Sequence, residues 1–218
     1  DHVLEIGSGW GSFAFYLISK FPDITIDTLT ISQEQYDFVK SKIEENHLQE
    51  NLNVIFKDYR EHQGEYSRIY SIEMFEAVGM QYWQIYFDKI KDLLKPSGVF
   101  SMQTIVIFEG LFEKYSQKID FIQKYIFPGG MLPTVKTLEN IAIEKKLDFF
   151  VKNQMADSYH QTLEMWRQNF NHKWDKIKNL GYSNEFKRMW NFYLSYCSGG
   201  FKAKTIDVFQ IDFTKNSN

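Results

Sequence analysis

The stretch Val3-Leu4-Glu5-Ile6-Gly7-Ser8-Gly9-Trp10-Gly11 lies near the start of the chain and decides the fold. Its first residues form a short apolar run, which predicts a strand, and the run leads directly into three glycines at alternate positions. Glycines at such a place let the backbone turn sharply and approach a ligand closely. The segment Trp10–Lys20 then places Phe13 and Leu17 at helical spacing. Strand, glycine turn and helix in this order predict the first unit of a doubly wound α/β sheet.

The rest of the chain continues the alternation of strand and helix. The further strands expected are Ile24–Leu29, Leu52–Lys57, Arg68–Ile72, Val99–Ile107, Asp148–Gln154 and Ile206–Phe213. The further helices expected are 33–46, which Ser32 caps with Gln35 as its capping-box partner, and Tyr82–Leu94, Val135–Lys146, Ser158–Lys178 and Glu185–Tyr196. These elements predict a seven-stranded, mostly parallel, Rossmann-like sheet, with an antiparallel edge formed by the last two strands.

No linker divides the chain, so we expect a single domain over residues 1–218. Residues 111–133 are expected to form a helical lid insertion, and residues 215–218 a polar tail. Because the chain opens directly on the first strand, the helices that would precede this strand are expected to be missing.

The composition argues against several classes of function. The chain has 25 Lys and Arg against 28 Asp and Glu, a net charge of −3, which is not typical of a nucleic-acid-binding protein. Its one cysteine, Cys197, excludes an intramolecular disulfide and a cysteine-rich zinc site, and no metal site is predicted. No stretch is long and apolar enough to span a bilayer. Aromatic residues make up 17% of the chain, a high share that the fold or the function has to account for.

The spacing of the glycine loop indicates its ligand. The pattern G-x-G-x-G is shorter than the dinucleotide fingerprint G-x-G-x-x-G, and Glu5 at the strand end also differs from the nicotinamide-binding pattern. A loop of this shape suits a nucleoside with a positively charged tail and no pyrophosphate, which describes S-adenosylmethionine. The alternative is a strand–helix turn that binds nothing.

Polar clusters follow the next three strands. They are Thr30-Ile31-Ser32, Asp58-Tyr59-Arg60 and Ile72-Glu73-Met74-Phe75-Glu76. Because ligands of open parallel sheets bind at the carboxyl ends of the strands, we expect the clusters to meet in one cleft. Simpler interpretations are helix caps for Thr30 and Ser32, a turn residue for Asp58 and a surface charge for Arg60.

Further segments follow the first one in fixed order: Leu29–Gln35, Lys57–Arg60, Ser71–Gly79, Tyr125–Pro133, Phe186–Trp190 and Cys197–Phe201. Together they resemble the S-adenosylmethionine-dependent cyclopropane-fatty-acyl-phospholipid synthases and the mycolic acid cyclopropane synthases. The glycine motif is shared with methyltransferases in general. Tyr125–Pro133, which reads Tyr-Ile-Phe-Pro-Gly-Gly-Met-Leu-Pro, is much more specific to this family.

The resemblance implies a methyltransferase domain that moves a methyl group from S-adenosylmethionine to a cis double bond of an unsaturated phospholipid acyl chain. The resulting carbocation loses a proton, for which bound bicarbonate is the base, and closes to a cyclopropane. The cofactor-binding residues expected are Glu5, Gly7, Ser8, Gly9, Gly11, Thr30, Ile31, Gln35, Asp58, Tyr59, Arg60 and Ile72. The catalytic residues expected are Glu76, Gln103, the carbonyl of Ile105, Tyr159 and Cys197.

One of these catalytic positions, Gln103, departs from the family pattern, and the role of another, Cys197, is open. The family carries a histidine where this chain has Gln103, and glutamine can donate a hydrogen bond to bicarbonate but cannot shuttle a proton. Cys197 matches a position once proposed as a nucleophile, yet an alkene needs no nucleophile from the enzyme. Its alternative role is that of a small buried apolar residue. The cysteine that the family places in an N-terminal segment has no counterpart in this sequence.

The partners that the resemblance implies are unsaturated phospholipid acyl chains and a peripherally contacted membrane, with no nucleic acid and a homodimer as a possible assembly. The contact is expected through the aromatic lid residues Phe112, Tyr115, Phe121, Tyr125 and Phe127, in a cytoplasmic, peripherally membrane-associated enzyme. A methyl-branched product from the same pocket, a small-molecule N-methyltransferase and a non-catalytic binding module are the alternatives.

Overall fold

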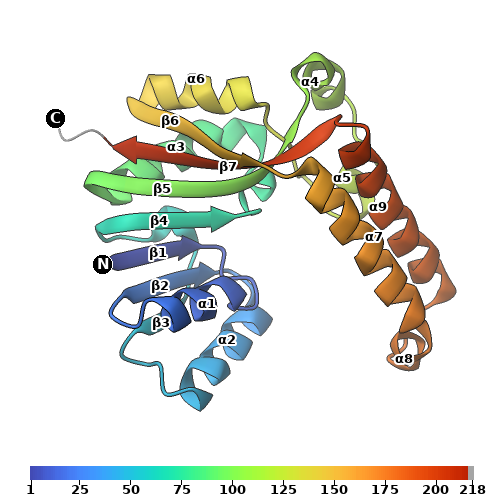
Figure 1. Cartoon of the computed structure of the whole chain (residues 1–218), viewed down its shortest axis with the longest axis horizontal. Coiled ribbons are helices and arrows are strands. Elements are labelled where there is room, and N and C mark those ends of the chain that lie inside the picture. Colours follow the sequence, from blue (N-terminus) through green and yellow to red (C-terminus); the bar gives the residue numbers. More distant parts are fainter. Residues whose placement is uncertain (216–218) are drawn as a thin grey trace.

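The computed structural model describes residues 1–215, so the last three residues of the expected tail lie outside the described part of the chain. Its centre is a seven-stranded sheet in the order β3-β2-β1-β4-β5-β7-β6 (Figure 1). Strands β1 to β5 pair in parallel, and β7 pairs antiparallel with both β5 and β6. The predicted doubly wound, mostly parallel sheet with an antiparallel edge is confirmed.

Six of the seven strands lie within two residues of their predicted bounds, whereas β5 begins five residues before the predicted Val99. The strands are β1 (His2–Ile6), β2 (Thr25–Thr30), β3 (Leu52–Phe56), β4 (Tyr66–Ile72), β5 (Leu94–Ile107), β6 (Leu147–Gln154) and β7 (Ile206–Lys215). Lys215, which the sequence assigns to the tail, is the last residue of β7. Its ammonium donates to the backbone carbonyls of Lys91 and Leu94 at 2.8 and 2.7 Å, so it belongs to the folded sheet.

The helices are α1 (Ser12–Lys20), α2 (Gln33–Glu45), α3 (Trp83–Leu93), α4 (Glu109–Ser116), α5 (Phe121–Tyr125), α6 (Val135–Lys145), α7 (Ala156–His172), α8 (Trp174–Asn179) and α9 (Asn184–Lys202). The first begins later than expected because Gly11, its N-cap, has a φ of 83° that a helix cannot contain. The helix expected over Ser158–Lys178 is interrupted at Lys173, where the backbone leaves helical geometry (ψ 10°).

Two other expectations about helix ends were wrong in part. Ser32 does accept the backbone N–H of Gln35, at 3.3 Å, but the Gln35 side chain accepts the hydroxyl of Thr30 instead of the Ser32 N–H. Thr30 therefore completes the cap, since its own hydroxyl oxygen accepts the Ser32 N–H. Helix α9 continues past Tyr196 to Lys202. A Cβ on Gly200 would lie 3.0 Å from Ile206, so glycine there allows close packing of α9 on β7.

The two faces of the sheet bury different helices. Alternate residues of β1 point to opposite faces: Leu4 packs in a core with α3 and α6, and Val3 packs in a core with α1 and α2. Much of the aromatic content belongs to the first core, where Phe87, Phe100 and Phe213 stack with ring centroids 5.1–6.1 Å apart. Burying each such ring contributes about 1.5–3 kcal/mol, so these aromatics stabilise the fold and are not available to a ligand.

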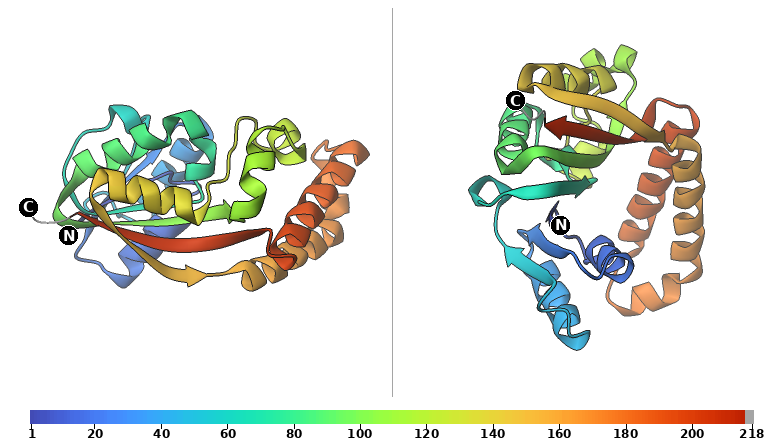
Figure 2. Two further views of the ribbon diagram at one scale, coloured as in Figure 1. Left: turned by 90° about the horizontal axis from the view of Figure 1, so that it is seen from above. Right: turned by 60° about the vertical axis from the view of Figure 1, so that its left-hand side comes forward.

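Beyond the carboxyl ends of β1 and β4, the molecule carries two further groups of helices. Helices α4 and α5 lie between β5 and α6 in the chain, and α7 and α9 form a long pair joined through α8. Figure 2 shows both groups at the same end of the sheet. No helix within residues 1–215 combines the length and the apolar character needed to cross a membrane.

Candidate active site

The glycine loop forms a tight turn at the carboxyl end of β1. The backbone N–H groups of Gly7 and Ser8 both donate to the Leu29 carbonyl of β2, at 3.1 and 2.7 Å. Gly9 has a φ of 50°, and a Cβ there would meet no protein atom within 4 Å. Space beside a glycine of this conformation is a feature of loops that let a ligand approach the backbone.

The residues expected to bind the cofactor lie along neighbouring strand ends. Thr30 ends β2 and is held by Gln35, while Ile31 directly after it is 74% exposed. Asp58 follows β3 and accepts three hydrogen bonds from Arg60, including a 2.6 Å contact to its guanidinium. That guanidinium lowers the pKa of the Asp58 carboxyl. The ends of β3, β2, β1 and β4 are adjacent in the sheet, so the structure brings these clusters to one edge.

Glu5 and Tyr59, two of the expected cofactor residues, make contacts within the fold. Glu5 is buried, and its carboxylate accepts the Thr28 hydroxyl at 2.5 Å, which joins β1 to β2 below the loop. Burial raises the pKa of this carboxyl to about 7. Tyr59 packs edge-on against Tyr86 with ring centroids 5.2 Å apart. Their predicted part in cofactor binding, like that of Ile72 at the end of β4, stays a prediction.

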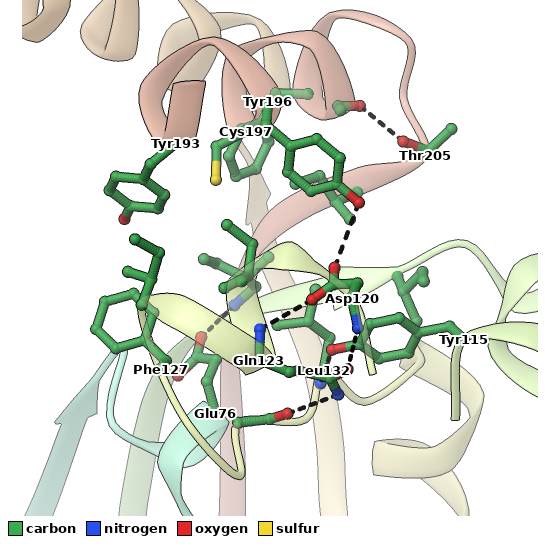
Figure 3. Close-up of a pocket in the computed structure, with 18 of the residues that line it drawn as sticks. Glu76, Tyr115, Asp120, Gln123, Phe127, Leu132, Tyr193, Tyr196, Cys197 and Thr205 are labelled. Carbon is green, nitrogen blue, oxygen red and sulfur yellow. Dashed lines mark hydrogen bonds between the residues drawn. The ribbon is translucent and has the colours of Figure 1, made fainter. Parts of the chain in front are cut away.

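A cavity of about 940 Å³ lies between the lid, the α7–α9 pair and the ends of β4 and β5. The lid contributes Leu111, Tyr115, Ile122, Ile126, Phe127 and Met131, among others. In Figure 3, Tyr193 and Cys197 project from α9 toward Phe127 of the lid and Glu76 below. Three carboxylates line the cavity, those of Glu73, Glu76 and Asp120, whereas within residues 1–215 no Lys, Arg or His side chain lines it.

Glu76 occupies a short 3₁₀ turn (Phe75–Ala77) after β4. Its Oε1 accepts the backbone N–H of Ile105 at 2.6 Å and the hydroxyl of Thr104 at 3.0 Å. Its Oε2 is buried and has no partner within the described chain. Burial raises the pKa of this carboxyl to about 7. Glu76 therefore presents one unsatisfied oxygen to the cavity, and its charge can change near neutral pH.

Gln103 and Tyr159, which are expected to hold bicarbonate, both contact the carboxylate of Glu73, a residue outside the expected catalytic set. The Gln103 amide donates to Oε1 of Glu73 at 2.9 Å, and the Tyr159 hydroxyl donates to Oε2 of the same side chain at 2.5 Å. Glu73 thus joins the end of β4 to β5 and α7. Glu73 lies in a polar segment that is evident in the sequence, but its role in this contact is not, since its partners lie 30 and 86 residues away in the chain.

The remaining expected site residues are placed as follows. Ile105 lies on β5 and lines the cavity, and its carbonyl receives a long contact of 3.4 Å from the Thr104 hydroxyl. Cys197 lines the cavity from α9, and burial raises the pKa of its thiol to about 12. A thiol with so high a pKa is a poor nucleophile at neutral pH. Four of the five expected catalytic residues line the cavity. The fifth, Gln103, does not line it but donates a hydrogen bond to Glu73, which does.

The lid is held over the cavity by polar contacts as well as apolar ones. Asp120 caps α5 in a capping box with Gln123, and the Tyr196 hydroxyl of α9 donates to Asp120 at 3.3 Å. The backbone N–H of Met131 donates to the carbonyl of Glu76 at 2.9 Å. The lid is therefore connected directly to the residue that carries the unpartnered oxygen.

Comparison with known proteins agrees with this arrangement. A family model described as mycolic acid cyclopropane synthetase matches residues 1–211. Tuberculostearic acid methyltransferase UfaA1 of Mycobacterium tuberculosis is 33% identical over 213 residues, which cover 96% of this chain and 49% of that protein. Cyclopropane-fatty-acyl-phospholipid synthase of Escherichia coli is 34% identical over 216 residues, which cover 98% of this chain and 53% of that protein.

A solved structure shows the same fold. Mycolic acid cyclopropane synthase CmaA1, complexed with SAH and CTAB, superposes with a TM-score of 0.86 at 25% identity, over 98% of this chain and 78% of that one. The chain spans about half the length of the two curated relatives. Because the family model matches nearly all of its residues, the chain belongs to the mycolic acid cyclopropane synthetase family.

Proposed function

We propose that the protein transfers the methyl group of S-adenosylmethionine to a cis double bond of an unsaturated phospholipid acyl chain, with closure to a cyclopropane. The observation that carries the proposal is the large, apolar, carboxylate-lined cavity that begins next to the glycine loop. A Cβ on Gly7 would lie 3.1 Å from Met74, which stands between Glu73 and Glu76 in the chain. The loop and the cavity are therefore adjacent.

The residues at the strand ends fit S-adenosylmethionine. The open space at Gly9 leaves room for the amino-acid tail beside the loop, and the exposed Ile31 side chain offers an apolar surface to the adenine. The relative solved with SAH belongs to the same family, which supports this cofactor. When bound, the cofactor supplies an electrophilic methyl group on a sulfonium.

The cavity fits an acyl chain and the charge that forms on it. Its volume lies at the upper end of the usual range for ligand pockets, about 300–1,000 Å³, and its walls are mainly apolar and aromatic. Methyl transfer to an alkene leaves a positive charge on the neighbouring carbon. Tyr193, Phe201 and Trp166 offer ring faces that stabilise a cation, and the carboxylates act in the same direction.

Bicarbonate, the base that the resemblance implies, finds only part of the expected set of ligands. The unpartnered Oε2 of Glu76 suits a small hydrogen-bonding ligand. Gln103 and Tyr159, however, donate hydrogen bonds to Glu73, so these hydrogens are not available to bicarbonate. The residues present therefore do not fit bicarbonate as the resemblance predicts, and its role remains a prediction for experiment.

A membrane contact through the lid completes the proposal, with a different set of residues from the one expected. Phe112 packs against the core, Phe121 packs against Phe192 with ring centroids 4.5 Å apart, and Tyr115 is only partly exposed. Ile119, Tyr125 and Phe127 are 77%, 55% and 56% exposed at the same end of the molecule. Exposed apolar groups beside an acyl-chain cavity are suited to the surface of a bilayer.

The test uses the full-length gene product, S-adenosylmethionine labelled in its methyl group, and vesicles of cis-unsaturated phospholipid. We expect label in the lipid extract, in a chain that is one CH₂ heavier and has lost its double bond. Vesicles of saturated phospholipid are the control and should take up none. Absence of label from the unsaturated lipid would refute the proposal, and a heavier chain that has no ring would assign the methyl-branching activity instead.

The three carboxylates support a second candidate, methylation of an amine, because a cavity lined by acidic and aromatic groups also suits a cationic nitrogen. The same labelled cofactor offered with a set of small amines separates the two functions. Label in the amine fraction, with none in lipid, would favour this alternative.

A further inference from the structure

We propose that Glu73 is the general base of the reaction, so that the chain carries its own carboxylate where the resemblance implies bicarbonate. The inference rests on the proposed methyl transfer to an alkene. Its basis is geometric: the two polar side chains expected to hold bicarbonate, Gln103 and Tyr159, each donate a hydrogen bond to one oxygen of Glu73. A carboxylate and a bicarbonate share a planar pair of oxygens, and Glu73 receives the donors that the anion would receive.

A directed chain of amides holds this carboxylate in place. The side-chain amide of Asn153 on β6 donates to the side-chain oxygen of Gln210 on β7 at 2.7 Å. The Gln210 side chain donates in turn to the side-chain oxygen of Gln103 at 2.9 Å. Gln103 in turn donates to Glu73. Every amide points its N–H₂ toward the carboxylate, so the chain of hydrogen bonds ends on an oxygen that accepts.

The backbone of Glu73 is unusual for a glutamate. Its φ is 51°, in the left-handed region that favours glycine, and its backbone N–H donates to the backbone carbonyl of Gln103 at 2.8 Å. This backbone conformation is unfavourable for a residue that carries a Cβ. A position with only a turning role would be occupied more stably by glycine, so the strain indicates that the carboxylate itself is used.

The location is suited to removal of a proton from the transferred methyl. Glu73 lines the cavity at the end of β4, one residue from the Met74 side chain that lies against the glycine loop. The π electrons of the alkene form the bond to the methyl carbon, and the S–C electron pair stays on sulfur. Glu73 then accepts a proton from that methyl, and the C–H electron pair closes the three-membered ring. Glu73 ends as a neutral acid that releases its proton to solvent before the next turnover.

The inference is tested by comparing three forms of the full-length protein in bicarbonate-depleted buffer and with bicarbonate added back. The parent should form cyclopropane at the same rate in both. Glu73→Gln keeps the size of the side chain and removes the base, so cyclopropane formation should fall by about 10²–10⁴-fold in both. Glu73→Gly suits the backbone and frees Gln103 and Tyr159 to hold an external anion. Its activity should fall in depleted buffer and recover when bicarbonate is added.

Two measurements separate a chemical role from a structural one. Calorimetric binding of S-adenosylmethionine should be unchanged in both variants, and Glu139→Gln, an exposed carboxylate on α6, should retain the parent rate. ¹³C-labelled bicarbonate should show line broadening with Glu73→Gly and none with the parent. A parent that needs bicarbonate, or a Glu73→Gln variant that forms cyclopropane at the parent rate, would overturn the inference. A parent that transfers no label to lipid under either condition overturns the proposed function instead.

Discussion

Burial of the Glu76 carboxyl makes a quantitative prediction about stability. Its pKa is raised from 4.5 to about 7, mainly because burial disfavours the charged form. Between these two pH values the folded chain keeps a proton that the unfolded chain has released. The free energy of unfolding therefore falls as the pH rises, and the total effect of this one group is about 3 kcal/mol above pH 7.

The substitution Glu76→Gln removes this dependence. Glutamine stays neutral at every pH, and its carbonyl oxygen can still accept the Ile105 N–H and the Thr104 hydroxyl. The stability of the variant relative to the parent should rise by about 2–3 kcal/mol between pH 5 and pH 8. Any fixed cost of burying the amide is the same at both pH values and cancels. Glu5, whose pKa is also about 7, is present in both proteins and cancels as well.

The measurement is reversible urea unfolding of parent and variant at pH 5, 6, 7 and 8, followed by tryptophan fluorescence and circular dichroism. Glu139→Gln serves as the control, and its stability curve should run parallel to that of the parent. Two neighbouring tyrosines, Tyr115 and Tyr159, do not titrate in this range because burial raises the pKa of both. Parallel curves for Glu76→Gln and the parent would show that the carboxyl is not held in a low-dielectric site, and the reasoning would fail.

Three further predictions follow from the site. Cys197→Ala should keep the methyl-transfer rate within about threefold, because a thiol with a pKa of about 12 is not the nucleophile; a rate loss of 100-fold or more would contradict this. Gly9→Ala should weaken S-adenosylmethionine binding in calorimetry by at least tenfold, whereas Gly181→Ala, which has the same open surroundings and a φ of 97° far from the loop, should bind as the parent does. Ile119→Ser combined with Tyr125→Ser should reduce flotation with phospholipid vesicles while leaving the melting temperature within about 2 °C; unchanged flotation would remove the lid from the membrane contact.

The strands could be read from the sequence because each is a short apolar run followed by a turn, and neighbouring strands of this fold are connected in a regular way. Helix ends were less predictable, since they depend on side-chain choices that the sequence leaves open. Gln35 has two acceptable partners, and only the folded position of Thr30 decides between them. The double glycine in α9 was a similar case, because a Cβ at Gly200 would lie 3.0 Å from Ile206, so that glycine allows the close packing there.

The candidate catalytic positions were predicted from the resemblance, and four of them line one cavity. What the sequence could not reveal was how their hydrogen bonds are distributed. That distribution depends on α7 reaching across the end of β4, so that Tyr159 meets Glu73 and not an external ligand. No local pattern marks Glu73, apart from its place in a segment of polar residues after a strand.

Gln103 and Glu73 have to be interpreted together. Glutamine cannot carry a proton, so a chain with Gln103 in place of histidine needs another group to take the proton from the cation. An amide is also well suited to the position it holds, because its oxygen accepts from Gln210 while its nitrogen donates to Glu73. Glutamine in place of histidine at position 103 therefore agrees with the proposal that Glu73 is the base.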